Sequence, residues 1–398
     1  MMNSKRPRLT TQGPTRRVVD PPLTEILYAD WRDMRRSWVR SWKAVFSERS
    51  LPQDLLAGLT VAAVALPLNL ALAVASGLPP VAGLVGGAIG GLIAGFAGGT
   101  PLQVTGPAAA LNVMVFAIAT QFGATGVAAA CLMIGIIQLA LAFSRAGHLA
   151  QFVPESVLAG FTTGVGLKLL DTQLPELMGF DYRVVELAAM MHRPAWLREV
   201  NWLSVVSGLF VAFLVVSTRR FQRFPAAIVG VGIVTFIANY IGWDIPRVGE
   251  VPDGLPPATI PLVADDQWLD LALAAFPLAL LAAVESLLSA SAVKRMTNGR
   301  EVSQPSLELV GQGLANLGVS FFAGMPVSGV VVRSGLNVQS GGRTRLSAIS
   351  HALILGSAVI LLSTELARVP LAALAGLLCV IGFRLVEFST LIHLARHE

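Results

Sequence analysis

One uncharged stretch constrains the fold of this chain more than any other feature. From Leu55 to Ser144, 90 consecutive residues include no Asp, Glu, Lys, Arg or His. The chain of 398 residues is 13% charged, whereas a soluble domain carries about a quarter charged residues. Only a lipid bilayer accommodates several apolar lengths in succession. The sequence therefore predicts an all-α polytopic membrane protein and excludes a large soluble core.

Apolar segments recur along the chain, and the loops between them indicate its orientation. The expected segments are 54–76, 81–98, 104–121, 124–144, 148–170, 201–218, 224–243, 267–293, 305–323, 328–341, 345–363 and 369–385. The short loops 217–224, 294–300 and 341–346 are basic, whereas the long loops 171–200 and 243–270 are mainly acidic. By the positive-inside rule, this alternation predicts a cytosolic N-terminus.

The N-terminal region carries much of the positive charge. Residues 1–49 hold eleven Lys and Arg against five Asp and Glu, and they lack the short apolar core of a signal peptide. We interpret them as a basic cytosolic region, with no nucleic acid as partner. Cys131 and Cys379 both lie in apolar runs, so neither a disulfide nor a metal site is indicated, and no cofactor is expected.

Two segments differ from the others because Pro and Gly stand where a spanning helix should begin. They are TPLQVTGPAAALNV, residues 100–113, and GMPVSGVVVRSGLNV, residues 324–338. Pro removes a backbone donor and Gly relaxes the chain, so an extended lead-in and a short helix are expected in each, over 105–118 and 330–341. Interrupted segments in matching positions of two halves point to the midplane site of a transporter. An odd number of steps separates the two, so the repeat is inverted and the helix N-termini face each other.

Arg333 lies about one turn into the second short helix. Helix N-termini offer unpaired N–H groups and about half a positive charge, so two facing N-termini suit an anion, and Arg333 adds a full charge. A mid-bilayer arginine costs on the order of 3 kcal/mol, and the only good partner within the apolar segments is Glu285. Ser289 follows Glu285 at i, i+4, on the same helix face.

Two interpretations of Glu285 and Arg333 stay open. In the first, they form a buried ion pair that only stabilises two helices. In the second, they face one hydrated cavity, an anion competes with the carboxylate for Arg333, and protonation of Glu285 couples to transport. Glu155 and Lys168, near the ends of the fifth segment, are weaker candidates because long or charged side chains near helix ends commonly reach the interface. The sequence contains no P-loop and no nucleophile–base set, so an enzyme is not expected.

Four stretches together resemble the sulfate permease (SulP) family of anion transporters. They are residues 54–84, 104–113, 284–292 and 324–349. The family includes bicarbonate, sulfate and dicarboxylate carriers and the motor protein prestin. The resemblance extends from about residue 50 onward, and it implies a seven-plus-seven inverted-repeat transporter fold, in which a core domain moves against a gate domain, and a homodimer.

The resemblance also implies a division into domains. The expected parts are a basic cytosolic region 1–49, core 50–144, gate 145–245, an external loop 246–266, core 267–363 and the start of the second gate half 364–398. About twelve of fourteen segments are then present, without the STAS domain common in the family, and we expect the chain to be part of a longer protein. The tenth-segment pattern is similar to that of a bacterial branch often joined to a carbonic anhydrase. This favours bicarbonate, a fused or associated carbonic anhydrase, and the bacterial inner membrane.

In the family, substrate binds between the third and tenth segments, and the first and eighth contribute. The matching residues here are Leu68, Leu72, Gly106, Ala108, Ala109, Glu285, Ser289, Val331, Val332, Arg333 and Ser334. In sodium-coupled bicarbonate members, a small residue stands at the Arg333 position, beside an acid and a hydroxyl that help to hold sodium. A guanidinium at this position repels a second cation. We therefore expect proton symport, anion exchange or uniport.

The expected function is secondary transport of a small anion, with bicarbonate favoured and sulfate next. A dicarboxylate carrier is an alternative. A nucleobase permease of the same fold would need polar side chains for the base edges, whereas Ala and Val surround the expected site. The third alternative is a voltage-sensing or scaffold role without transport.

Overall fold

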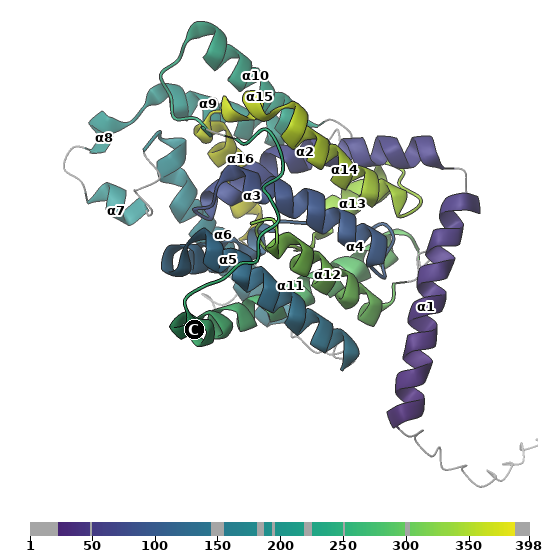
Figure 1. Cartoon of the computed structure of the whole chain (residues 1–398). Coiled ribbons are helices and arrows are strands. Elements are labelled where there is room, and N and C mark those ends of the chain that lie inside the picture. The colour runs from purple at the N-terminus through teal and green to yellow at the C-terminus, as the bar shows by residue number, and fades with distance from the viewer. Residues whose placement is uncertain are drawn as a thin grey trace, which may run out of the picture.

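The computed structural model describes residues 23–47, 50–144, 155–180, 187–192, 196–218, 225–249, 251–298 and 303–386. Within these ranges the chain is almost entirely helical (Figure 1). The helices of the first half are α1 (Leu23–Ser47), α2 (Leu51–Ala75), α3 (Pro80–Val85), α4 (Gly91–Ala97), α5 (Asn112–Phe143), α6 (Glu155–Leu177), α7 (Leu187–Met191), α8 (Trp196–Glu199), α9 (Trp202–Ser217) and α10 (Ala226–Ile241). Those of the second half are α11 (Trp268–Met296), α12 (Pro305–Ser320), α13 (Val331–Gln339), α14 (Leu346–Leu361), α15 (Ser363–Ala367) and α16 (Leu371–Leu385).

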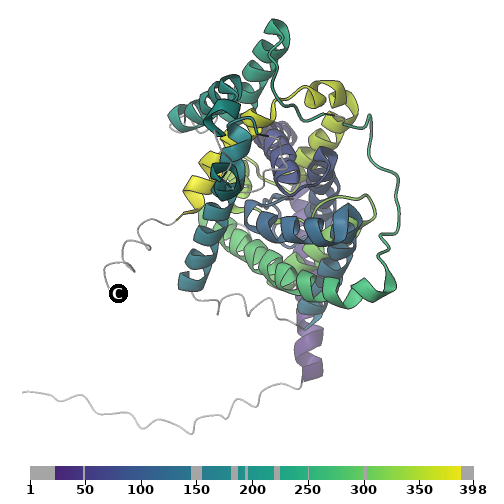
Figure 2. The ribbon, with the colours of Figure 1, turned by 90° about the vertical axis from the view of Figure 1, so that its left-hand side faces the viewer.

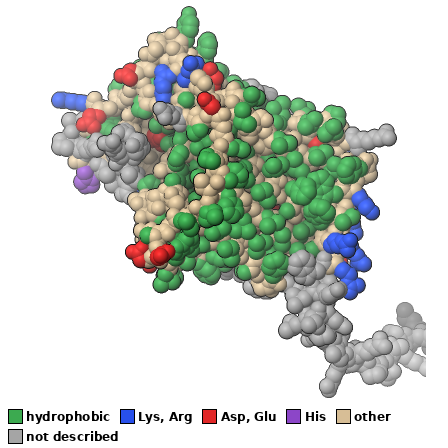
Figure 3. Space-filling model, in the orientation of Figure 1, with side chains coloured by type: hydrophobic (Ala, Val, Ile, Leu, Met, Phe, Trp, Pro, Cys, Tyr) green, Lys and Arg blue, Asp and Glu red, His purple; other side chains and the backbone are tan. Residues whose placement is uncertain are grey.

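Most of the predicted segments correspond to helices with similar bounds. By length and composition, the described helices that could cross a membrane are Leu51–Ala75, Pro80–Ala97, Ala109–Phe143 and Asp265–Met296. Shorter apolar helices are Trp202–Ser217, Ala226–Ile241, Leu346–Leu361 and Leu371–Leu385. The predicted segment 148–170 is shifted, since α6 spans Glu155–Leu177 and residues 145–154 lie outside the described ranges. Hydrophobic side chains cover most of the face visible in Figure 3, as expected for a surface in contact with lipid.

The third predicted segment folds differently from the expectation in one respect. The expected helix 105–118 begins later, with a 3-10 turn at Ala109–Leu111 that leads into α5. The reason is the strand β1 (Thr105–Gly106), which pairs antiparallel with β2 (Ser328–Gly329). A backbone committed to this ladder cannot form helical hydrogen bonds. Helix α5 then merges the third and fourth predicted segments across a break at Gly123, where φ is 70°, a left-handed conformation that favours glycine.

The helices pack in two groups. In the first group, α5 packs on α11 and α12, and α14 packs on α2 and α4. In the second group, α16 packs on α6 and α9, and α10 packs on α9. Helix α2 also contacts α10 and α16 and so connects the groups. The extended chain 251–264 runs along the outside of the bundle from α10 toward α11 (Figure 2).

Helix α12 holds both strands of the short ladder in place through one polar face. Gln312 donates from Nε2 to Oγ1 of Thr105, the first residue of β1, at 2.7 Å. One turn further on, the Asn316 amide accepts from the Val327 N–H at 2.9 Å and donates to the Val327 carbonyl at 3.0 Å. Both amide side chains are fully buried. Because Val327 precedes β2 directly, Asn316 fixes the backbone at the point where the second interrupted segment enters the ladder.

A helix at the N-terminal side of the bundle was not predicted from the sequence. Residues 1–49 were interpreted only as a basic cytosolic region, yet α1 occupies Leu23–Ser47 and lies against the end of the bundle where α2 begins and α4 finishes (Figure 1). We refer to this as the α1 end of the bundle. The sequence 384–398 also predicts an amphipathic cytosolic stretch, and its residues 387–398 lie outside the described ranges.

Candidate anion-binding site

The strand pair β1–β2 brings the two interrupted segments together. Thr105 pairs with Gly329 and Gly106 with Ser328, so the two chains run in opposite directions where they cross. The helices that follow them, α13 and the 3-10 turn leading into α5, therefore both begin beside this crossover. The structure thus confirms that the interrupted segments meet, with extended lead-ins instead of continuous helices. Their N–H groups and partial positive charges converge on one region.

Arg333 projects from the first turn of α13 into this region. The residue is 1% exposed, and its Nη2 donates to the Pro107 carbonyl at 3.1 Å. Its Nε and Nη1 have no protein partner among the described residues. An unpaired buried guanidinium N–H is costly, so these groups are suited to binding an anion.

Glu285 lies near Arg333 without touching it. Its Oε2 accepts a hydrogen bond of 2.7 Å from the Ser328 hydroxyl in β2. Arg333 and Glu285 interact by Coulomb attraction, but they form no direct ion pair. Glu285 and Arg333 are therefore paired by charge without a direct contact, because the Arg333 guanidinium donates to the Pro107 carbonyl and the Ser328 hydroxyl donates to the Glu285 carboxylate.

A cavity of about 290 Å³ connects these groups. Arg333 and Glu285 both line it, together with the start of α13 and the chain after β1. The remaining walls are mostly aliphatic side chains. The volume is at the small end of the usual range for ligand pockets, which is about 300–1,000 Å³. The cavity combines one fixed cation, one carboxyl group and apolar walls, and such a set suits a small anion rather than a large polar molecule.

The predicted site residues divide into two sets by position. Those that line the cavity are Leu68, Ala108, Ala109, Glu285, Val331, Val332 and Arg333. Those that do not line it are Leu72, Gly106, Ser289 and Ser334, all of which are buried. Ser334 accepts from the Val104 N–H at 2.9 Å, and its hydroxyl lies 3.2 Å from that of Ser289. These two serines thus join α11 and α13 to the chain before β1.

Sequence reasoning missed part of the wall. The additional lining residues are Val64, Pro107, Ala110, Leu281, Leu288, Val330, Leu336, Ile381 and Leu385. Ile381 and Leu385 are the most informative, because they belong to α16 in the second group of helices. Both are ordinary aliphatic residues in an apolar helix, so no sequence signal separates them from their neighbours. The site is therefore bounded by both groups of helices.

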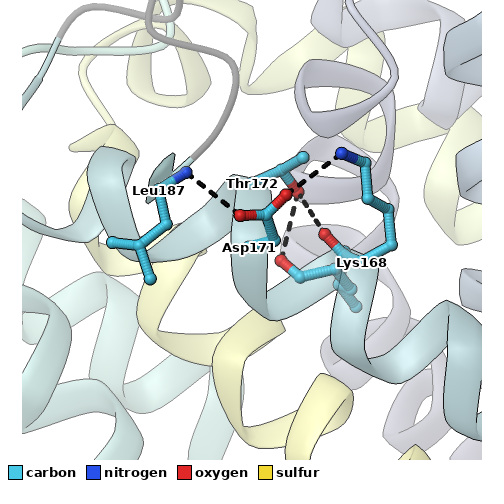
Figure 4. Close-up of polar contacts among 5 residues, drawn as sticks. Lys168, Asp171, Thr172 and Leu187 are labelled. Atoms are coloured by element: carbon cyan, nitrogen blue, oxygen red, sulfur yellow. Dashed lines mark hydrogen bonds and ion pairs between the residues drawn. The ribbon is translucent and has the colours of Figure 1, made fainter. Parts of the chain in front are cut away.

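Lys168 forms an ion pair with a carboxylate on the same helix. Its Nζ lies 3.0 Å from Oδ2 of Asp171, one turn further along α6 (Figure 4). Oδ1 of the same carboxylate accepts from the Leu187 N–H at 3.1 Å, at the start of α7. These contacts link α6 to α7 and favour a structural role for Lys168. The side chain of Glu155 lies outside the described part of the structure.

A substitution at Gly106 tests whether the position of the Arg333 guanidinium determines anion binding. A Cβ at residue 106 would lie 2.6 Å from Nη1 of Arg333. We expect Gly106→Ala to displace the guanidinium and to weaken anion binding roughly tenfold, which corresponds to about 1.4 kcal/mol and to the loss of about one hydrogen bond. Gly232→Ala in α10 is the matched control, because its Cβ would meet open space. Unchanged anion affinity in Gly106→Ala would show that the space at residue 106 does not position Arg333.

The geometry of the crossover and the cavity is typical of one class of membrane protein. Two interrupted helices meet at a strand crossover inside a multi-pass membrane protein, and a buried arginine and a carboxyl group line a small cavity beside it. This is the arrangement of an inverted-repeat carrier. Residues 51–398 match the sulfate permease family. The chain belongs to this family.

Individual relatives agree with this assignment. The chain is 29% identical over 362 residues to the putative sulfate transporter YvdB of Bacillus subtilis, covering 88% of this chain and 68% of the relative. It is 30% identical to the bicarbonate transporter BicA of Synechocystis, covering 86% and 63%. It is also 30% identical to the probable sulfate transporter Rv1739c of Mycobacterium tuberculosis, covering 92% and 65%. The chain thus spans about two thirds of the length of these relatives.

Solved structures show the same fold. The transmembrane domain of a cyanobacterial BicA superposes with a TM-score of 0.79 at 28% identity, covering 86% of this chain and 90% of that one. The murine anion transporter Slc26a9 in its inward-facing state gives a TM-score of 0.81 at 20% identity, covering 99% and 71%. The chain therefore has the seven-plus-seven inverted-repeat transporter fold of these proteins.

Proposed function

We propose that the chain is the membrane domain of a secondary active transporter of a small anion, with bicarbonate favoured and sulfate next. The anion binds beside the β1–β2 crossover, where Arg333 supplies the positive charge. The observation that carries this proposal is the unpaired Nε and Nη1 of a fully buried arginine that lines a 290 Å³ cavity. A charge-assisted hydrogen bond from guanidinium to an anion is about twice as strong as a neutral one.

The two groups of helices suggest how the anion moves. We assign 50–144 and 267–363 to a core domain, and 145–245 and 364–398 to a gate domain, with 246–266 as the external loop. The cavity lies between Arg333 on the core side and Ile381 and Leu385 on the gate side. Movement of the core against the gate, like an elevator, would carry the anion across the membrane. We further propose a homodimer in the bacterial inner membrane, with the α1 end of the bundle in the cytosol.

Coupling to sodium is not part of this proposal. In low dielectric, the guanidinium of Arg333 repels a cation held by Glu285 and Ser289, since Coulomb energy between charges rises as the dielectric falls. Proton symport or anion exchange, with Glu285 as the coupling residue, fits the site better. Proteoliposomes loaded without sodium test this directly. We expect equal uptake of labelled bicarbonate or sulfate with external sodium or choline, and uptake that requires sodium would exclude this coupling.

Glu285→Gln tests the coupling role separately from binding. The glutamine keeps the size of the side chain and still accepts from the Ser328 hydroxyl, but it cannot exchange a proton. We expect uptake in proteoliposomes to lose its response to an imposed pH gradient, while anion binding persists. Glu365→Gln is the matched control, because Glu365 is an exposed carboxylate of α15 outside the cavity. A pH response that survives in Glu285→Gln assigns coupling to another group.

The same assay with several anions tests the transport proposal as a whole. Labelled bicarbonate, sulfate and fumarate are supplied in turn to proteoliposomes that contain the purified chain. We expect saturable uptake of bicarbonate or sulfate that the unlabelled anion inhibits. Saturable uptake of fumarate alone would identify a dicarboxylate carrier instead. Absence of uptake for all three would contradict transport of these anions.

A further inference from the structure

Helix α1 has two chemically different faces. Over residues 32–47, where its side chains are described, Arg35, Arg36, Arg40 and Lys43 are exposed and fall within about 140° of the helix surface at about 100° per residue, with the exposed Val39 and Phe46 among them. The adjoining side carries Met34, Trp38 and Trp42, which are buried or half-buried. One exposed acid, Asp33, lies 3.8 Å from Arg36, and an exposed pair of this kind holds its partner only weakly. The exposed face therefore carries a net positive charge.

Aromatic residues of α1 pack against the C-terminal end of α4. The Trp38 indole donates to the Phe96 carbonyl at 3.0 Å. The Trp42 ring packs against the Phe96 ring with centroids 4.9 Å apart. These contacts fix α1 at the level where a membrane-spanning helix ends, which is the level that Trp side chains favour in membrane proteins.

Arg345 completes this attachment from the start of α14. The residue is 1% exposed, and its Nη1 donates to the carbonyls of Gly95 at 2.8 Å and Phe96 at 2.7 Å. Its guanidinium also lies 5.1 Å from the centre of the Trp42 ring, a cation–π contact. The cation thus stabilises the C-terminal end of α4 and at the same time links α1 to α14. Helix α1 is therefore attached to both α4 and α14.

Helix α1 lies across the end of the bundle, not parallel to the helices inside it. In Figure 1 it runs crosswise to α2 and α4 and extends past the edge of the bundle. Figure 3 shows Lys and Arg side chains gathered at this edge of the molecule. A basic helix held at this level presents its exposed Arg and Lys side chains to the lipid headgroups, while its aromatic side packs on α4.

We propose that α1 binds anionic phospholipid headgroups through Arg35, Arg36, Arg40 and Lys43, and so anchors the α1 end of the bundle to the membrane surface. The positive charge of the exposed face is complementary to a negatively charged lipid surface. Each basic residue close to such a surface strengthens binding by about 1 kcal/mol, or roughly fivefold. The proposal does not depend on anion transport, since its residues lie outside the cavity.

Lipid binding by the purified full chain tests the proposal. The probe is fluorescent phosphatidylglycerol in mixed micelles of a neutral detergent, with phosphatidylcholine as the uncharged comparison. The first variant combines Arg35→Glu, Arg36→Glu, Arg40→Glu and Lys43→Glu. The matched control keeps every charge with Arg35→Lys, Arg36→Lys, Arg40→Lys and Lys43→Arg. Melting curves without added lipid establish that both variants are folded, and the pair Arg40→Gln and Lys43→Gln replaces the first variant if it is not.

We expect charge reversal to weaken the apparent affinity for phosphatidylglycerol at least 25-fold, equivalent to two contacts at roughly fivefold each. The charge-preserving control should remain within twofold of the wild type. Raising the salt to 1 M shortens the screening length to about 3 Å and should remove most of the lipid selectivity. Equal phosphatidylglycerol affinity in the reversed and wild-type proteins would overturn the proposal. Displacement of the lipid by an equal concentration of glycerol phosphate would overturn it as well, because the site would then bind a free phosphate.

Discussion

Replacement of Arg333 with alanine is expected to weaken anion binding roughly 30- to 150-fold. The substitution removes the buried cation that lines the cavity and leaves its facing helix N-termini and Glu285 in place. A lost charge-assisted contact corresponds to about 2–3 kcal/mol. The Arg333 guanidinium also donates to the Pro107 carbonyl. Part of the loss of affinity will therefore come from greater mobility of the chain after β1, which no longer has this hydrogen bond. Equilibrium binding of labelled bicarbonate or sulfate to the purified protein measures the change.

A second substitution at residue 333 separates charge from shape, and a substitution at residue 368 serves as the control. Arg333→Lys keeps a cation but loses the planar fork of donors, so we expect an intermediate loss of affinity. Arg368→Ala is the matched control, because Arg368 is an exposed arginine of the same protein that pairs with Glu365. Wild-type affinity in Arg333→Ala would remove Arg333 from the binding site. An equal loss in Arg368→Ala would show that overall charge, and not the cavity, governs binding.

Replacement of Asn316 with leucine is expected to lower the free energy of unfolding by about 2–6 kcal/mol. The leucine has a similar volume but leaves the N–H and carbonyl of Val327, and the buried Oε1 of Gln138, without their Asn316 partner. Each buried backbone group left unpaired costs about 1–3 kcal/mol. Since Val327 leads directly into β2, we also expect the crossover to loosen and anion uptake to fall. The midpoint of unfolding in mixed detergent and denaturant measures the first effect.

The matched control for Asn316 lies on the same helix. Leu314 is 39% exposed, on the outer side of α12, and Leu314→Ala should shift the midpoint far less. Asn316→Asp retains one acceptor for the Val327 N–H and should recover part of the loss. If Asn316→Leu and Leu314→Ala shift the midpoint equally, the amide does not hold the crossover in the way its contacts indicate.

Much of the fold could be predicted because membrane segments follow simple physical rules. The absence of charge from Leu55 to Ser144 required a bilayer. Pro and Gly before the third and tenth segments required interrupted helices, and the structure places both lead-ins in one strand pair. A permanent charge in an apolar segment marked Arg333, which does line a cavity together with Glu285.

Other features could not be predicted because they depend on contacts across the fold. The apolar side chains of Ile381 and Leu385 acquire their role only from the packing of α16 beside the cavity. The Arg333 guanidinium donates to the Pro107 carbonyl rather than to Glu285, because the strand pair brings the chain around Pro107 close to α13. Helix α1 had a detectable signal, with aromatic and apolar residues at helical spacing in Trp31, Met34, Trp38 and Trp42, but its many basic residues masked that pattern.

A density map of the protein equilibrated with the anion that it transports is the most direct test of the site. We expect density for the anion beside the β1–β2 crossover, about 2.7–2.9 Å from the Arg333 guanidinium, the usual length of a charge-assisted hydrogen bond. Helices α13 and α5 should begin next to it. Density for the anion elsewhere, an uninterrupted helix through either segment, or an Arg333 side chain directed toward the acyl chains would contradict the proposed site.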